Sequence, residues 1–270
     1  MLSILNSISS LNAENALSST QANLQKTLTA LSTGLRINSG ADDAAGLSIA
    51  NGLAGNIAAL NQSVSNASDG VGILQTADGA LSQVTTLLNR AVTLATEASN
   101  SGLSSTQYTA LDGEYQDILT EIGNIGTSTT FNGNAVFGSS VGAYISDGST
   151  TGSVSITATL AALTANGLGL KGKLDSSTDA QSELTNITAA IATVAGDRGT
   201  IGATENQLTA SQGVASTEAT NLTSAENDIQ NADIGKTVAS MTQYNVLEQT
   251  GMAALSQSNQ VQQSVLKLLQ

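Results

Sequence analysis

The chain contains no cysteine, histidine, proline or tryptophan among its 270 residues. Without Cys and His it cannot form a disulfide, a Cys-His or Ser-His-Asp nucleophile, or the commonest zinc sites. Without Pro, no residue rigidly interrupts a helix. We therefore expect no enzyme, no cofactor and no metal site, and the sequence leaves room for long unbroken helices.

Basic and aromatic residues are also scarce. Lys and Arg number 8 against 21 Asp and Glu, which gives a net charge of -13. Such an acidic chain is repelled by nucleic-acid phosphates and by anionic membrane surfaces. Aromatics are 2% of the residues although hydrophobic residues are 40%, so the apolar content suits helices with a narrow buried stripe better than a thick globular core. No run of about 18 apolar residues is present, so we expect no transmembrane helix.

The first zone, from Met1 to about Asn124, has helical periodicity. Between Ala50 and Ala95 apolar residues recur in steps of three and four, which is typical of a coiled coil. Only Asp78 and Thr85 interrupt this frame. Its members are Ala50, Leu53, Ile57, Leu60, Val64, Ala67, Val71, Leu74, Asp78, Leu81, Thr85, Leu88, Val92 and Ala95. An earlier helical frame is predicted from the spacing of Leu17, Leu24, Leu28, Leu31 and Leu35. A later helix is predicted over Leu111 to Ile125.

The last zone, from about Asp179 to Gln270, also has helical periodicity. One apolar residue recurs every seven positions, at Ile187, Val194, Ile201, Leu208, Ala215, Leu222 and Ile229. From about Ala232 onward, apolar residues occupy more than one face. A helix of this kind needs neighbours on several sides, and at a chain terminus we expect other subunits to supply them.

The middle of the chain indicates a β-hairpin. Val141, Ala143 and Ile145 would share one strand face, Val154 and Ile156 another, and DGSTTG would form the loop. Two strands are too few for a separate domain. The predicted fold class is mainly α: an elongated antiparallel helical bundle or coiled coil with a small β-hairpin region in the middle.

Two patterns have a chemical and a simpler interpretation. Asp42 and Asp43 stand where a helix is expected to begin. In the simpler interpretation their carboxylates interact with the partial positive charge of the helix N-terminus. In the chemical interpretation they would act as a general acid and base, which would require a shaped pocket around them. Gly167, Gly169 and Gly172 satisfy G-x-G-x-x-G. A dinucleotide site would also need a strand before and a helix after this motif, and neither flank fits, so we interpret it as a connection.

Both ends resemble one family. LSTGLRINSGADDAAGLSIANGL (Leu31 to Leu53), the FNG close at Phe131 to Gly133, and the segment from Ala232 to Gln270 are similar to bacterial flagellin. The resemblance implies a short form without large outer domains. It also implies a secreted structural subunit that polymerises into the flagellar filament for motility, as a helical homopolymer.

The resemblance implies a division of the chain. Residues 1–40 and 232–270 would form an inner-tube helical domain, and residues 41–178 and 179–231 a rod domain, with the hairpin region in the first of these. The subunit interface would include Leu24, Leu28, Leu31, Leu35, Leu255, Val261, Val265, Leu268 and Leu269.

The resemblance also implies partners. These are the flagellar export apparatus and its chaperone, the filament cap and the hook-junction proteins; export by this route explains secretion although the first residues make a poor signal peptide. A Toll-like receptor would read a patch of Asn89, Arg90, Leu94 and Glu114, in which Asn89 replaces the family's Gln. The alternative role of Arg90 is a salt bridge with a nearby carboxylate. Asn227-Asp228-Ile229 stands where the family usually has S-R-I.

Two other functions remain open. A hook–filament junction protein is similar at both ends, although the intact NSGADDAAGL stretch favours flagellin. A secreted adhesin or enzyme on a helical stalk is the alternative from another class, and the absence of His, Cys and Trp argues against it.

Overall fold

The computed structural model describes residues 8–149 and 152–268. The chain divides into two compact units, each built from both halves of the sequence. Unit 1 takes the residues up to Ala54 and from Leu222 onward, and unit 2 takes Gly55–Asn221. The boundaries expected from the family resemblance stay a prediction.

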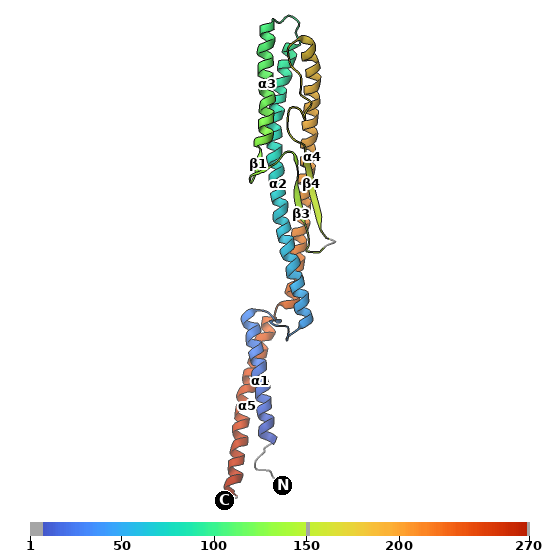
Figure 1. Cartoon of the computed structure of the whole chain (residues 1–270). Helices are drawn as coiled ribbons and strands as arrows, with labels where there is room; N and C mark the ends of the chain where they lie inside the picture. Colours follow the sequence, from blue (N-terminus) through green and yellow to red (C-terminus); the bar gives the residue numbers. More distant parts are fainter. Residues whose placement is uncertain (1–7, 150–151, 269–270) are drawn as a thin grey trace. The chain divides into compact units, whose positions relative to one another are not determined.

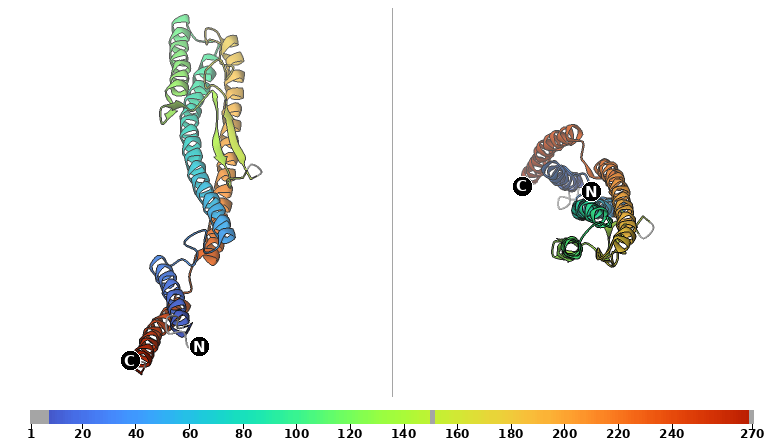
Figure 2. Two further views of the ribbon diagram at one scale, coloured as in Figure 1. Left: turned by 60° about the horizontal axis from the view of Figure 1, so that its bottom comes forward. Right: turned by 90° about the horizontal axis from the view of Figure 1, so that it is seen from above.

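Unit 1 is a pair of helices with a short crossover. Helix α1 (Ile8–Thr33) and helix α5 (Ile234–Leu268) lie side by side in Figure 1 and in the left view of Figure 2. The start of α2 (Ala44–Ala98) and the end of α4 (Ser177–Gln230) also belong to this unit. The pair is antiparallel.

A column of half-buried side chains joins α1 and α5. On α1 the column is Ser10, Ala13, Leu17, Thr20, Leu24, Thr27 and Leu31, and on α5 it is Thr237, Met241, Tyr244, Glu248, Gly251, Leu255 and Ser258. The hydroxyls of Ser10 and Ser258 lie 2.8 Å apart, and Gln21 donates to Glu248 at 3.1 Å. The steps of three and four are those of a two-stranded coiled coil, but Ser, Thr and Gly occupy about half of the positions.

Unit 2 combines three helices with a hairpin. Helix α3 (Ser105–Ser128) runs beside the later part of α2, and α4 returns along α2 (Figure 1). Strands β3 (Ser139–Ile145) and β4 (Val154–Leu160) pair antiparallel, with Val141 opposite Ala158 and Ala143 opposite Ile156. A two-residue ladder of β1 (Thr130–Phe131) and β2 (Asn134–Ala135) precedes them. The predicted mainly α fold with a central hairpin is confirmed.

The core of unit 2 corrects the predicted frame of α2. One predicted column is buried, at Leu60, Ala67, Leu74, Leu81, Leu88 and Ala95. The second buried column lies one residue earlier than predicted, at Ser63, Gly70, Ala77, Val84, Ala91 and Ala98. The interruptions at Asp78 and Thr85 thus fall beside the core, where they are only half-buried. The second column holds small residues because other elements pack closely there: Gly70 lies against Leu208 of α4 and Ala143 of β3.

Helix α4 also has two buried columns. The predicted seven-residue repeat is buried from Ile187 to Ala215, and a second buried column, at Glu183, Ala190 and Thr204, lies four residues before members of that repeat. Arg198 of α4 forms a bidentate ion pair with Asp78 of α2, with N–O distances of 2.7 and 3.1 Å. This ion pair joins α2 to α4 at the partly exposed edge of their contact.

Local side chains set the helix starts. The hydroxyl of Ser104 accepts from the Gln107 amide in a capping box at the start of α3. Asp43 accepts from the Gly46 amide at 2.9 Å at the start of α2, and Asp233 accepts from the Lys236 amide at 3.0 Å at the start of α5. The helix-start interpretation is therefore confirmed for Asp43.

The glycine-rich segment between the hairpin and α4 is a packed connection. Leu170 and Leu174 are buried in the core, and Gly169 adopts a positive φ of 79°. A Cβ at Gly172 would overlap the carboxylate of Glu183, so the glycine there permits a close approach. Strand β4 ends at Leu160, before the motif begins at Gly167, and α4 begins only at Ser177, so the motif does not directly join a strand to a helix as a nucleotide-binding loop does.

Candidate assembly surface

Exposed hydrophobic side chains gather in unit 1. Of the 13 exposed large hydrophobic residues in the described part of the chain, ten belong to unit 1: Ile8, Leu11, Leu28, Ile49, Ile234, Val238, Val246, Leu247, Met252 and Val261. Within the same described residues, the fully buried hydrophobic side chains of unit 1 are only Ile37 and Ala50, whereas unit 2 holds the whole main core. Exposed apolar surface of this kind is typical of a region that packs against another protein chain.

The exposed residues of α5 surround the helix. Val246 follows Tyr244 of the seam by two residues, about 200° around the helix, so it lies on the face away from α1. Leu247 and Val261 flank the seam on one side, and Val238 and Met252 flank it on the other. Since α1 covers only one face of α5, the others are open to neighbours.

The segment that follows α1 crosses the junction between α4 and α5, and hydrogen bonds join the two segments there. Leu35 and Asn231 form an antiparallel bridge, and the amide of Arg36 donates to the carbonyl of Gln230 at 2.7 Å. The guanidinium of Arg36 donates from Nε and Nη2 to the carbonyl of Ile229 at 3.0 and 2.7 Å. A cation at the last turn of a helix satisfies carbonyls that lack a partner in the helix. Ile229 thus supplies a backbone acceptor in the stretch where the sequence departs from the family's usual residues.

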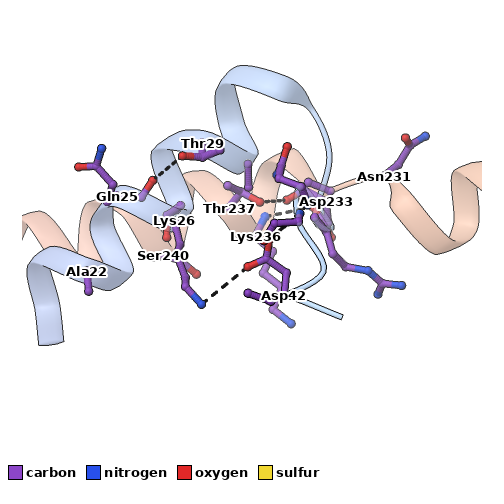
Figure 3. Close-up of a pocket in the computed structure, with 17 residues that line it drawn as sticks. Ala22, Gln25, Lys26, Thr29, Asp42, Asn231, Asp233, Lys236, Thr237 and Ser240 are labelled. Atoms are coloured by element: carbon purple, nitrogen blue, oxygen red, sulfur yellow. Dashed lines mark hydrogen bonds and ion pairs between the residues drawn. The ribbon is translucent and has the colours of Figure 1, made fainter. Parts of the chain in front are cut away.

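A hollow of about 870 Å³ lies beside this crossover (Figure 3). Its lining includes Lys26 of α1, Asp42 of the loop, and Asp233 and Lys236 at the start of α5. Lys26 points toward Asp42, with Nζ 3.7 Å from Oδ1.

The carboxylate of Asp42 organises the loop before α2. It accepts from the Ser39 hydroxyl at 2.9 Å and from the Ser39 amide at 3.0 Å. The hydroxyl hydrogen bond, together with the amides of Asn38 and Ser39 and the charge of Lys26, holds the pKa of Asp42 below its ordinary value. The carboxylate stays ionised and bound to the loop.

The predicted subunit-interface residues separate into three groups. Leu28 and Val261 are exposed on outer faces, at 45% and 52%. Leu24, Leu31 and Leu255 lie in the seam between α1 and α5, and Leu35 lies in the crossover, so these four already make contacts within the chain. Val265, Leu268 and Leu269 fall outside the side chains that the structure describes.

The predicted receptor patch is only partly on the surface. Asn89, Arg90 and Glu114 are exposed, whereas Leu94 is 1% exposed and belongs to the core. Arg90 donates to both carboxylate oxygens of Glu114, at 2.7 and 3.0 Å. This is the salt bridge that the sequence left as the alternative role of Arg90, and the hydrogen bond to Arg90 lowers the pKa of Glu114.

Sequence reasoning missed the hollow. Lys26 and Arg36 are close in the sequence, but nothing in the pattern places Lys236 beside them. Only the antiparallel course of α1 and α5 brings these three cations together. Among the residues described, no cluster of acidic side chains could hold a metal ion, and no helix has the length and apolar content to cross a membrane.

Comparisons with known proteins agree on one family. Residues 4–142 match the bacterial flagellin N-terminal helical region, and residues 184–269 match the bacterial flagellin C-terminal helical region. The flagellin of Halalkalibacterium halodurans is 34% identical over 248 residues, which are 91% of each chain. The flagellin of Bacillus subtilis is 31% identical over an alignment that covers 98% of this chain and 99% of that one.

Solved structures agree. The crystal structure of Bacillus cereus flagellin is 30% identical, with a TM-score of 0.50, and covers 60% of this chain and 94% of that chain. A flagellar hook-associated protein from Vibrio parahaemolyticus has a TM-score of 0.57 at 17% identity, which shows a shared fold alone. The resemblance identified from the sequence is confirmed over both ends, and near-complete coverage of the curated relatives favours a filament subunit over the junction protein and the adhesin. The chain therefore belongs to the bacterial flagellin family, the structural subunits of the extracellular flagellar filament.

Proposed function

We propose that copies of this chain polymerise through the outer faces of α1 and α5. The observation that carries the proposal is the concentration of exposed large hydrophobic side chains on these helices. Burying such a side chain contributes about 1.5–3 kcal/mol. Several of them on one helix pair supply a driving force for association that the single chain cannot realise.

The open faces point in several directions, which suits a polymer better than a dimer. A two-fold dimer covers one patch on each partner, whereas a helical assembly uses different patches on opposite sides. Val246 lies away from α1, while Met252 and Leu247 lie on either side of the seam. Each copy of unit 1 would therefore contact more than one neighbour.

The geometry divides the expected interface residues by role. Leu28 and Val261 are proposed to contact neighbouring copies, because they are exposed in the single chain. Leu24, Leu31 and Leu255 are proposed to hold α1 against α5, so that the pair presents its outer faces in a fixed register. An aspartate at Leu31 would therefore act first on the pair and only through it on the filament.

Seeded polymerisation tests the proposal. Val246 is 54% exposed in the single chain, so Val246→Asp should leave the circular dichroism spectrum of the soluble protein unchanged. Burying that charge between copies is heavily penalised, and we expect no filaments by negative-stain electron microscopy. Val214→Asp makes the same substitution at a valine of α4 in unit 2 that is 66% exposed, and this matched control should still polymerise. Normal filaments from Val246→Asp would overturn the assignment of this face.

The further partners are proposed from the family resemblance. We propose that the chain leaves the cell through the flagellar export apparatus with a chaperone, and that it meets the filament cap and the hook-junction proteins at the ends of the filament. We expect a Toll-like receptor, if it binds, to read Asn89 and the ion-paired Arg90 and Glu114, with Leu94 supporting α2 from the core. A receptor reporter assay with Arg90→Ala and Glu114→Ala tests this patch.

A further inference from the structure

The hollow of unit 1 gathers positive charge in an acidic chain. Lys26, Arg36 and Lys236 line it, and they are three of the eight basic residues in the whole sequence. Two carboxylates, Asp42 and Asp233, also line it. The lining therefore carries an excess of cations, although the chain as a whole carries a net charge of -13.

The three cations differ in how they are engaged. Lys26 lies 3.7 Å from Asp42, and Arg36 is held on the carbonyl of Ile229. Lys236 has no ion pair in the described part of the chain. The backbone amide of Lys236, and not its ammonium group, donates to the carboxylate of Asp233. Lys236 is thus a cation in the lining of the hollow without an ion-pair partner among the described residues.

Unit 2 carries the larger excess of negative charge. It contains 14 acidic and four basic residues, a net charge of -10, against seven acidic and four basic residues in unit 1. Three of its four basic side chains already pair within the unit, Arg90 with Glu114, Arg198 with Asp78 and Lys173 with Asp175. The remaining carboxylates leave a strongly acidic surface that a cationic hollow on another copy would neutralise.

We propose that the hollow formed by Lys26, Arg36 and Lys236 receives carboxylates from unit 2 of a second copy of this chain. The proposal rests on the polymerisation proposed above and adds an electrostatic contact to it. The apolar faces of α1 and α5 supply the driving force, and the hollow selects the position of the incoming copy. Exposed charge pairs affect association rate and register more than affinity, so the contact makes filament growth depend on salt.

Charge reversal at Lys236 tests the contact. Lys236→Glu places an acid in the first turn of α5, where it interacts favourably with the helix terminus, so a loss of assembly is not explained by unfolding of α5. The matched control is Lys171→Glu, which makes the same change at a lysine of unit 2 outside the hollow. Elongation of preformed seeds is followed from about 10 mM to about 1 M salt, over which the Debye length falls from about 30 Å to about 3 Å.

At low salt we expect Lys236→Glu to elongate about tenfold more slowly than the unaltered chain, and the difference to disappear at high salt. Lys171→Glu should elongate at close to the unaltered rate. Equal rates for Lys236→Glu and the unaltered chain at low salt would overturn the contact while leaving polymerisation intact. Failure of the unaltered chain to form filaments would instead overturn the proposed function.

Chemical coupling tests the partner directly. Filaments grown from an equal mixture of ¹⁴N- and ¹⁵N-labelled chains are treated with a carbodiimide, which joins an amine to a carboxylate in contact with it. We expect peptides in which Lys236 of one label is joined to an Asp or Glu of residues 55–221 of the other label. Coupling of Lys236 only to peptides of its own label would overturn the proposal.

Discussion

Tyr115 of α3 donates its phenolic hydrogen to Oε1 of Glu183 on α4 at 2.6 Å, inside the core of unit 2. The two residues are 0% and 2% exposed. Asn186 donates to the other carboxylate oxygen at 2.8 Å. Burial, and then the hydrogen bond to Glu183, raise the pKa of Tyr115, so the phenol remains the donor. This polar contact fixes α3 and α4 relative to each other among apolar neighbours.

Removing the hydroxyl of Tyr115 should destabilise unit 2. Tyr115→Phe keeps the ring but leaves a buried carboxylate oxygen without its donor, which costs about 1–3 kcal/mol. Urea unfolding followed by circular dichroism measures the loss. Tyr108→Phe is the matched control, since the Tyr108 hydroxyl donates to the carbonyl of Asn100 at the exposed end of α3. An equal effect of the two substitutions would contradict the role given to Glu183.

The ion pair between Asp78 and Arg198 should make stability depend on pH. The hydrogen bond from Arg198 holds the pKa of Asp78 below its ordinary value of 3.8. The folded chain therefore keeps this carboxylate ionised where the unfolded chain protonates it. The contribution is present above the ordinary pKa and is lost as the pH falls through the lowered pKa.

A double-mutant cycle measures this contribution. Both side chains are 38% exposed, so the coupling free energy between Asp78→Asn and Arg198→Met should be at most about 1 kcal/mol at pH 6. It should be smaller in urea unfolding at pH 2, because protonation of Asp78 removes its charge. A coupling that stays unchanged between these pH values would show that ionisation of Asp78 does not contribute.

Two glycine substitutions should have opposite effects. A Cβ at Gly142 of β3 would overlap the carbonyl of Ile156 and the Cα of Thr157 on β4, and backbone atoms cannot move aside without separating the strands. Gly142→Ala should therefore cost about 1–3 kcal/mol. Gly113 of α3 has open space at its Cβ position, so Gly113→Ala should stabilise by up to about 1 kcal/mol. Thermal unfolding of the two variants checks the signs, and a stabilised Gly142→Ala protein would refute the close strand contact.

Periodicity predicted the helices well and the core less well. The seven-residue columns through Leu74 and Ile201 are buried as expected, because large apolar side chains mark a helix face clearly. The second column was placed one residue late, since Ser63, Gly70 and Ala77 do not stand out as core residues in a sequence. Their burial depends on how closely α4 and the hairpin approach α2, and that distance is a property of the packed unit.

The candidate assembly surface was predicted only in outline. Excess apolar faces on the last helix are visible in the sequence, and Val246 and Met252 show them as exposed side chains. Which leucines lie within the pair and which face outward depends on the rotation of α1 against α5. That rotation is set by contacts such as Leu17 against Gly251, which join residues far apart in the chain.

The capping side chains have a consequence for how the molecule acquires its structure. Asp43, Ser104 and Asp233 each fix the first turn of a helix through an amide no more than three residues away. Nucleation is the costly step of helix formation, and here it is guided by neighbours in the sequence and needs no distant contact. A chain that emerges in an extended state can therefore begin each helix at its correct residue before the halves of either unit meet.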